Sequence, residues 1–141
     1  MCHSGHFNAI RQGAATVHTL VIGPNSDEEI AIAKGPTVLN GQERAEILQA
    51  VKWGDEVTPN TPYEVTESVL DEVNCEYWIH GDDPCFANGV DMCQYLDSIG
   101  RFKEIRRTTG VSTTDLTGRL LDLLNNSSSG AEESKSGGTS D

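Results

Sequence analysis

Two histidines stand three residues apart near the front of the chain, in the run His3-Ser4-Gly5-His6, just before a stretch of helical periodicity. Two imidazoles at a helix N-terminus can both face an anion, and the helix dipole adds to the attraction. The glycine between them lets a phosphate approach the backbone closely. The run predicts a phosphate site, although the same spacing also fits a surface pair or half of a metal site.

A second group of polar residues lies near the other end, where the run from Arg106 to Thr114 reads RRTTGVSTT. A basic pair and a glycine turn lead there into a helix that begins with hydroxyl side chains. Free N–H groups of a first helical turn, hydroxyls and a guanidinium together suit a polyphosphate. The competing interpretation is an ordinary capped helix at the surface.

The overall charge limits the partners of the chain, because 22 acidic residues against 10 basic ones leave a formal net charge of −12. Such a balance argues against a protein that wraps a nucleic-acid backbone or lies on an anionic membrane. A small phosphorylated ligand needs only a few local cations. Four of the basic residues fall within seven positions of one another, and they are Arg101, Lys103, Arg106 and Arg107.

The four cysteines show no C-x-x-C spacing, so neither a zinc site nor a redox motif is indicated, and no metal ligands are predicted. Reduced thiols in a chain without a signal peptide are typical of the cytoplasm. No apolar run approaches the roughly 20 residues of a membrane span. We therefore expect a cytoplasmic protein without a transmembrane segment.

Short apolar runs alternate with stretches of helical period, which predicts an α/β fold with a parallel sheet. The last helix opens with Ser112 and has Asp115 three positions on, as in a capping box. We expect one domain over residues 1–124 and a disordered Ser/Gly-rich tail or linker over residues 125–141. The expected strands cover residues 19–22, 55–58, 76–79 and 103–106, and the expected helices cover residues 6–16, 42–52, 66–73, 90–99 and 112–124.

Taken together, H-x-G-H near the start and R-T-x-G-x-S-T-T near the end resemble the signature of the cytidylyltransferase family, in order and in separation. The run from Lys34 to Asn40, KGPTVLN, resembles the K-G-x-x-V-x-N loop of that family. Finer features resemble its ethanolamine branch, namely HSGHFNAIRQ, SDEEI, KW-x-DEV and NC-x-x-x-x-HGDD. The choline branch typically has A-H-D-D where this chain has HGDD.

The resemblance implies a Rossmann-like nucleotidyltransferase fold, with a parallel sheet flanked by helices. It implies transfer of CMP from CTP to phosphoethanolamine in phosphatidylethanolamine synthesis, with Mg²⁺ accompanying CTP. Phosphocholine as the acceptor and a non-catalytic nucleotide-binding fragment are the alternatives. A homodimer, or a pseudo-dimer with a second tandem domain, is the expected assembly.

The resemblance also implies a role for each matching residue. His3 and His6 contact the CTP phosphates and stabilise charge in the transition state, while Lys34 bridges the α-phosphate and the phosphate of the second substrate. The remaining triphosphate contacts fall on the segment that ends in the last helix, namely Arg107, Thr108, Gly110, Val111, Ser112 and Thr113.

Three further residues are expected around the cytidine and the substrate amine. Asp83 is assigned to the nucleotide, and Asp82 to the phosphorylated alcohol. Tyr63 stands where the choline branch places an aromatic residue against the ammonium group. On their residue types alone, the two aspartates also fit a turn and the tyrosine a packing role.

One departure from the family concerns the start of the chain, because the family has a buried central strand ending in G-x-F-D before H-x-G-H. The first residue here lies two positions ahead of His3. About five buried apolar side chains at roughly 1.5–3 kcal/mol each rival the net stability of a domain. We therefore expect residues 1–124 to behave as an N-terminally truncated domain, unstable or inactive alone.

Overall fold

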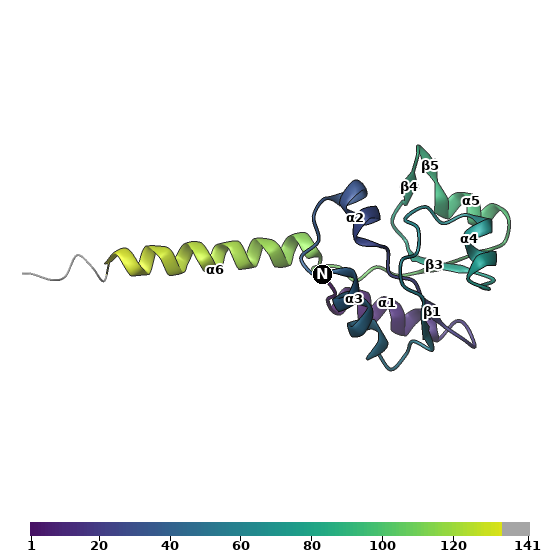
Figure 1. Ribbon diagram of the computed structural model, residues 1–141, viewed down its shortest axis with the longest axis horizontal. Coiled ribbons are helices and arrows are strands. Elements are labelled where there is room, and N and C mark those ends of the chain that lie inside the picture. The colour runs from purple at the N-terminus through teal and green to yellow at the C-terminus, as the bar shows by residue number, and fades with distance from the viewer. Residues whose placement is uncertain (134–141) are drawn as a thin grey trace, which may run out of the picture. The chain divides into compact units, whose positions relative to one another are not determined.

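The computed structural model describes the chain from Met1 to Glu133, and it divides into two units, Met1–Thr109 and Gly110–Asp141 (Figure 1). The first unit alternates helices and short strands, and the second contains α6 (Thr113–Glu133). The elements of the first unit are α1 (Ser4–Ala14), β1 (Val21–Ile22), α2 (Asp27–Lys34), α3 (Gly41–Gln49), β2 (Glu56–Val57), α4 (Glu67–Glu72), β3 (Trp78–Gly81), β4 (Phe86–Ala87), β5 (Val90–Asp91), α5 (Met92–Ser98) and β6 (Phe102–Ile105).

Two parallel strand pairs organise the first unit. Strand β1 pairs with β2, with Val21 opposite Glu56, and β3 pairs with β6 from Trp78 opposite Phe102 onward. Helix α1 contacts β3 and β6, α5 contacts β6, and α3 contacts β2. Parallel strands joined through helices confirm the expected Rossmann-like α/β fold.

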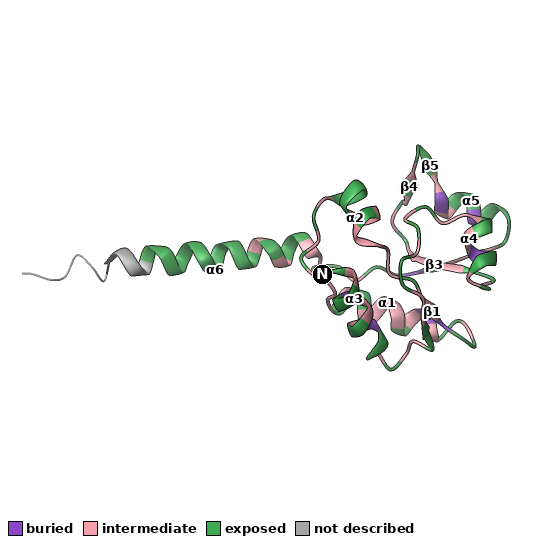
Figure 2. Ribbon diagram, viewed as in Figure 1, coloured by how far each residue is buried: buried purple, intermediate pink, exposed green. Residues whose placement is uncertain are grey.

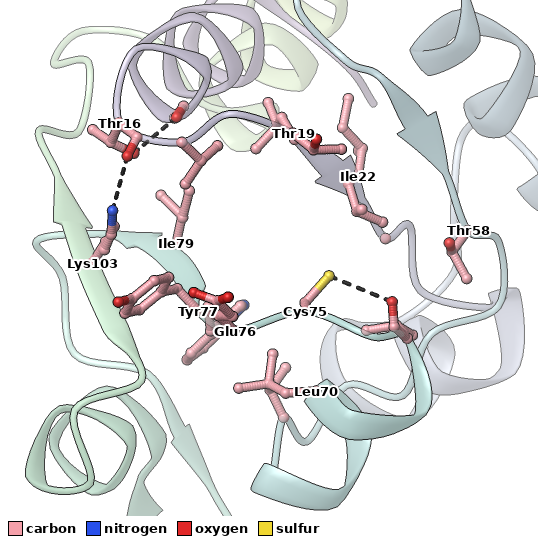
Figure 3. Close-up of a pocket in the computed structure, with 18 of the residues that line it drawn as sticks. Thr16, Thr19, Ile22, Thr58, Leu70, Cys75, Glu76, Tyr77, Ile79 and Lys103 are labelled. Carbon is pink, nitrogen blue, oxygen red and sulfur yellow. Dashed lines mark hydrogen bonds between the residues drawn. The ribbon is translucent and has the colours of Figure 1, made fainter.

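A cavity of about 690 Å³ separates the two strand pairs and is lined from both of them (Figure 3). Helix α1 passes close to each side, since a methyl group at Gly13 would lie 3.5 Å from Leu20 Cδ1 and 3.6 Å from Ile79 Cδ1.

The buried apolar side chains of the described residues are dispersed through the first unit (Figure 2). Leu96 of α5 is completely inaccessible to solvent. Hydrogen bonds from capping side chains also help to define the helices. At the start of α3, the Asn40 and Glu43 side chains each accept from the backbone N–H of the other. The other buried apolar residues are Leu20, Leu48, Leu70, Met92 and Ile105.

The structure contains two features that the sequence analysis did not anticipate. Helix α2 begins at a serine cap, where Ser26 Oγ accepts from the Glu29 N–H at 3.2 Å. Strands β4 and β5 form an antiparallel hairpin around Asn88 and Gly89, which both have positive φ angles. Such a pair is the usual two-residue turn of a hairpin, so the expected helix from residue 90 begins only at Met92.

Helix α6 is longer than expected and runs nine residues past Leu124. The expected capping by Ser112 is present, since its Oγ accepts from the Asp115 N–H at 3.1 Å. Serine hydroxyls then donate to carbonyls one turn back, as Ser127 does to Leu123 at 2.8 Å. Residues 125–133, expected as irregular tail, are thus helical, and the remainder of that tail, residues 134–141, lies outside the described residues. No described helix is both long and apolar enough to cross a lipid bilayer.

Candidate functional site

The two histidines at the start of α1 cap the helix on which they stand. His3 Nδ1 accepts a hydrogen bond from the Gly5 N–H at 3.1 Å, and His6 Nδ1 accepts from the His3 N–H at 3.3 Å. The two ring centroids are 4.0 Å apart. Two of the four N–H groups that every helix leaves unsatisfied near its start are therefore used to fix two imidazoles side by side.

These hydrogen bonds fix the tautomer of both rings. Because Nδ1 accepts in each, the neutral ring carries its proton on Nε2. Desolvation, with the positive charges of His3, the Met1 amino group and Lys34, lowers the pKa of His6 from 6.5 to about 4. Desolvation, the Met1 amino group and Arg107 also lower the pKa of His3. At neutral pH the pair therefore offers two neutral Nε2–H donors.

Lys34 is the last residue of α2, and the chain turns at Gly35, whose φ angle is +95°. The lysine is exposed. It is close enough to α1 for its charge to lower the pKa of His6, and close enough to Cys85 to act on that thiol as well. The lysine of the expected family loop therefore lies on the same side of the first unit as the histidine pair.

A buried arginine holds the loop that follows Lys34. The side chain of Arg44 is 8% exposed, and its Nη1 contacts Asp27 Oδ1 at 2.8 Å and the Leu39 carbonyl at 2.6 Å. Asp27 in turn accepts from the Gly41 N–H at 3.0 Å. These contacts join the first residue of α2 to the far end of the loop, residues 35–40. The sequence analysis missed both residues, although an arginine inside a helix face beside apolar positions was a usable signal.

Arg107 follows β6 and is held by the aspartate pair. Its Nη1 contacts Asp83 Oδ2 at 2.8 Å, and its backbone N–H donates to Asp82 Oδ1 at 3.2 Å. Thr108 accepts a hydrogen bond from the Asn8 side chain of α1 at 2.7 Å. Since the charge of Arg107 lowers the pKa of His3, the guanidinium lies near the histidine pair.

The first unit thus brings together most of the predicted site residues from segments far apart in the sequence: His3, His6, Lys34, Asp82, Asp83, Arg107 and Thr108. The other predicted triphosphate contacts, from Gly110 to Thr113, belong to the second unit. Their part in the site stays a prediction. The sequence indicated this grouping through the order of the H-x-G-H and R-T-x-G-x-S-T-T motifs along the chain.

Tyr63 lines a hollow of about 350 Å³ in the first unit. Its backbone N–H donates to Glu29 Oε2 at 3.2 Å, which ties it to α2. The hollow also includes Ala33, the neighbour of Lys34, together with the ring of Phe86 and the carboxylate-bearing Glu64. An aromatic and acidic lining of this kind suits a small organic cation.

Within the part of the chain that the structure describes, no cluster of three or more histidine, cysteine, aspartate or glutamate residues could hold a metal ion. All four cysteines are free. Cys93 lies 3.7 Å from His80 Nδ1, and desolvation, followed by the neighbouring Cys85 thiol, raises the pKa of Cys93 to about 11. A thiol with such a pKa stays protonated at neutral pH and is a poor nucleophile.

Comparison with known proteins agrees with this geometry. The chain is 47% identical over 122 residues to the ethanolamine-phosphate cytidylyltransferase of Dictyostelium discoideum, 46% over 122 residues to that of Mus musculus and 48% over 126 residues to that of Arabidopsis thaliana. Each match covers 86% of this chain and 34%, 30% and 30% of the respective relative, so the chain spans about a third of the length of these relatives. The sequence model of the cytidylyltransferase-like family matches residues 1–119. The chain therefore belongs to the cytidylyltransferase-like family.

Proposed function

We propose that the protein transfers the cytidylyl group of CTP to phosphoethanolamine, giving CDP-ethanolamine and pyrophosphate. The observation that carries this proposal is the grouping, on one unit, of two neutral imidazole donors with a free lysine and an arginine. The three relatives named above are ethanolamine-phosphate cytidylyltransferases, which supports the choice of acceptor.

The proposed reaction needs no protein nucleophile. A phosphate oxygen of phosphoethanolamine attacks the α-phosphorus of CTP in line, the bond from that phosphorus to the bridging oxygen breaks, and pyrophosphate leaves. Catalysis consists of positioning two anionic groups and neutralising the charge that develops between them. The positive charge of Lys34 offsets the repulsion between the α-phosphate of CTP and the phosphate of phosphoethanolamine. His3 and His6 donate Nε2–H groups to the triphosphate oxygens.

Arg107 and Thr108, with the Gly110 to Thr113 segment, are proposed to hold the β- and γ-phosphates. A guanidinium that already contacts Asp83 is oriented before the nucleotide binds, which lowers the entropy cost of binding. Asp83 is assigned to the cytidine side, and Asp82 with Tyr63 to the ethanolamine side. The acidic lining of the hollow beside Tyr63 favours an ammonium group that can donate hydrogen bonds.

A magnesium ion bound to CTP is part of the proposal, because the triphosphate carries more negative charge than the lysine and arginine neutralise. Mg²⁺ usually takes phosphate oxygens and waters, with one or two carboxylates. Asp82 and Asp83 fit this pattern, since each contacts Arg107 through one oxygen and has a second that can accept from a metal-bound water. When bound, the cation supplies charge neutralisation at the leaving phosphates.

The direct test incubates the protein, with and without an apolar strand fused ahead of Met1, with CTP, Mg²⁺ and either phosphoethanolamine or phosphocholine. It follows the CDP-alcohol by chromatography. We expect CDP-ethanolamine as the main product. A preference for phosphocholine would move the protein to the choline branch. CTP binding without turnover, in a version that also carries an apolar strand ahead of Met1, would identify a nucleotide-binding domain without activity.

We also propose a cytoplasmic location and a paired assembly, either as a homodimer or beside a second tandem domain. The four unpaired thiols support a reducing compartment. Size-exclusion chromatography with light scattering distinguishes a dimer from a monomer.

A further inference from the structure

One side chain of α1 forms a two-point contact with a single residue beyond β6. Gln12 Nε2 donates to the Arg106 carbonyl at 2.9 Å, and the Arg106 N–H donates to Gln12 Oε1 at 3.0 Å. A primary amide carries a donor and an acceptor in one plane, so it can match the N–H and C=O of one extended residue. The Gln12 side chain thus takes the place that a neighbouring strand would occupy.

A second side chain of α1 holds the residue two positions further on. Asn8 lies four residues before Gln12, hence on the same helical face, and its Nδ2 donates to Thr108 Oγ1 at 2.7 Å. The segment from Arg106 to Thr108 is therefore attached to α1 at both of its ends, with Arg107 between them. These contacts join positions 94 and 100 residues apart in the sequence.

The same helix carries the histidine pair at its N-terminus. A rigid helix with hydrogen-bonded contacts at Asn8 and Gln12 sets the distance between the imidazoles and the guanidinium of Arg107. The contact of Asn8 with Thr108 places the residue after Arg107 against α1 only two positions beyond His6. The aspartate contacts of Arg107 orient its guanidinium, and the two amides hold the residues on either side of it against α1.

We propose that Asn8 and Gln12 are positioning residues. They hold Arg107 and Thr108 beside His3 and His6, so that these four residues bind the same triphosphate. This inference rests on the proposed function and adds to it. Neither amide takes part in the reaction itself. Their effect is on the placement of phosphate-binding groups, where an error of about 1 Å can cost up to about 100-fold in rate.

A purely structural role for the two amides makes a different prediction. Loosening the attachment of β6 to α1 would then lower stability and change every kinetic constant by a similar factor. A positioning role affects the constants that depend on the triphosphate, namely the KM for CTP and the inhibition constant for pyrophosphate. It leaves the KM for phosphoethanolamine nearly unchanged.

The test compares Gln12→Leu and Asn8→Ala with the unmodified protein and with Gln42→Leu. Gln42 is an exposed glutamine of α3 whose Nε2 donates to Glu46 Oε1 at 3.0 Å within the same helix, so it is a matched control. We expect each of the first two variants to raise the KM for CTP and the inhibition constant for pyrophosphate by about 10-fold, with less than about a 2-fold change for phosphoethanolamine. Gln42→Leu should change none of these constants.

Calorimetric titration with CTP on the same four proteins separates this inference from the proposed function. If no CDP-ethanolamine forms but Gln12→Leu binds CTP about 10-fold more weakly than Gln42→Leu does, the inference holds and the proposed function fails. If CDP-ethanolamine forms and the Gln12 and Gln42 variants have equal constants, the inference is overturned and the proposed function stands. Absence of CTP binding by the unmodified protein overturns both.

Discussion

A neutral imidazole can donate a hydrogen bond to a phosphate without first losing or gaining a proton. In His3 and His6 this state follows from one local arrangement, because each Nδ1 accepts a backbone N–H at the start of α1. The ring is then oriented and its tautomer is set, while desolvation and nearby positive charges lower its pKa. The hydrogen bonds that cap the helix therefore also orient the imidazole donors of the site.

The lowered pKa of His6 predicts a pH dependence of stability. The unfolded ring titrates near 6.5 and the folded ring near about 4, so the unfolded state binds more protons between these values. The resulting destabilisation is absent above pH 6.5 and grows as the pH falls towards 4. Urea unfolding at about pH 7 and about pH 4.5 should show a smaller acid-induced loss for His6→Gln than for the unmodified protein. Equal losses would show that His6 keeps its ordinary pKa in the folded state.

Lys34 predicts a loss of activity without a loss of stability. Its side chain is exposed at the end of α2, so Lys34→Ala should leave the melting temperature unchanged. Removal of the charge that neutralises the two phosphates should lower kcat by about 100- to 1,000-fold. Lys52→Ala is the control, since this lysine lies over the Trp53 ring and has no assigned role. Similar turnover in the two variants would argue against the role of Lys34.

At the scale of elements, the loop between α2 and α3 depends on a single buried arginine. Arg44 connects the α3 helix with the first residue of α2 and with the Leu39 carbonyl. The Gly41 N–H and Arg44 hold the pKa of Asp27 below its usual value. The position of Lys34 thus depends on contacts that join the start of α2 to the far end of the loop that follows it.

Arg44→Met tests this dependence. The change removes three charge-assisted hydrogen bonds, to Asp27 and to the Leu39 and Asn25 carbonyls. It should destabilise the fold by about 2–3 kcal/mol, less than for a fully buried ion pair, because water reaches Asp27. Hydrogen exchange should accelerate at residues 35–41. Arg119→Met is the matched control, since Arg119 is an exposed residue of α6. Unchanged exchange in the loop would mean that Arg44 does not hold it.

At the scale of the whole molecule, the cavity between the two strand pairs of the first unit presents strand edges from both sides. The carbonyls of Leu20 and Ile22 accept from residues at β2, so the backbone groups of Val21 between them point the other way. Trp78 likewise donates towards β6, which leaves Ile79 facing the cavity. The backbone groups of Val21 and Ile79 are thus directed away from the partner strands of β1 and β3.

A strand fused ahead of Met1 is therefore expected to stabilise the protein. About five apolar residues in extended form should raise the melting temperature by at least about 10 °C, because each buried side chain contributes roughly 1.5–3 kcal/mol. A Gly/Ser extension of equal length serves as the control. Equal melting temperatures for the apolar and the Gly/Ser extensions would contradict this prediction.

The motifs, the α/β pattern and the four parallel strands could be predicted from the amino-acid sequence, because they depend on local periodicity and on residue types at fixed spacing. It did not reveal α2 or the β4–β5 hairpin, although Ser26 with Glu29 and the Asn88-Gly89 pair were usable local signals. Short elements with little burial gave too weak a periodic pattern.

The contacts that hold the site together could be seen only in the folded structure. These contacts join residues that are distant in the sequence. Gln12 bonds Arg106, and Arg44 bridges α2 and the loop after it. No local pattern specifies such a pairing, since the same polar residues on an isolated helix would be solvated. The sequence indicated which groups bind phosphate, and the packing of α1 against β3 and β6 decided which of them lie together.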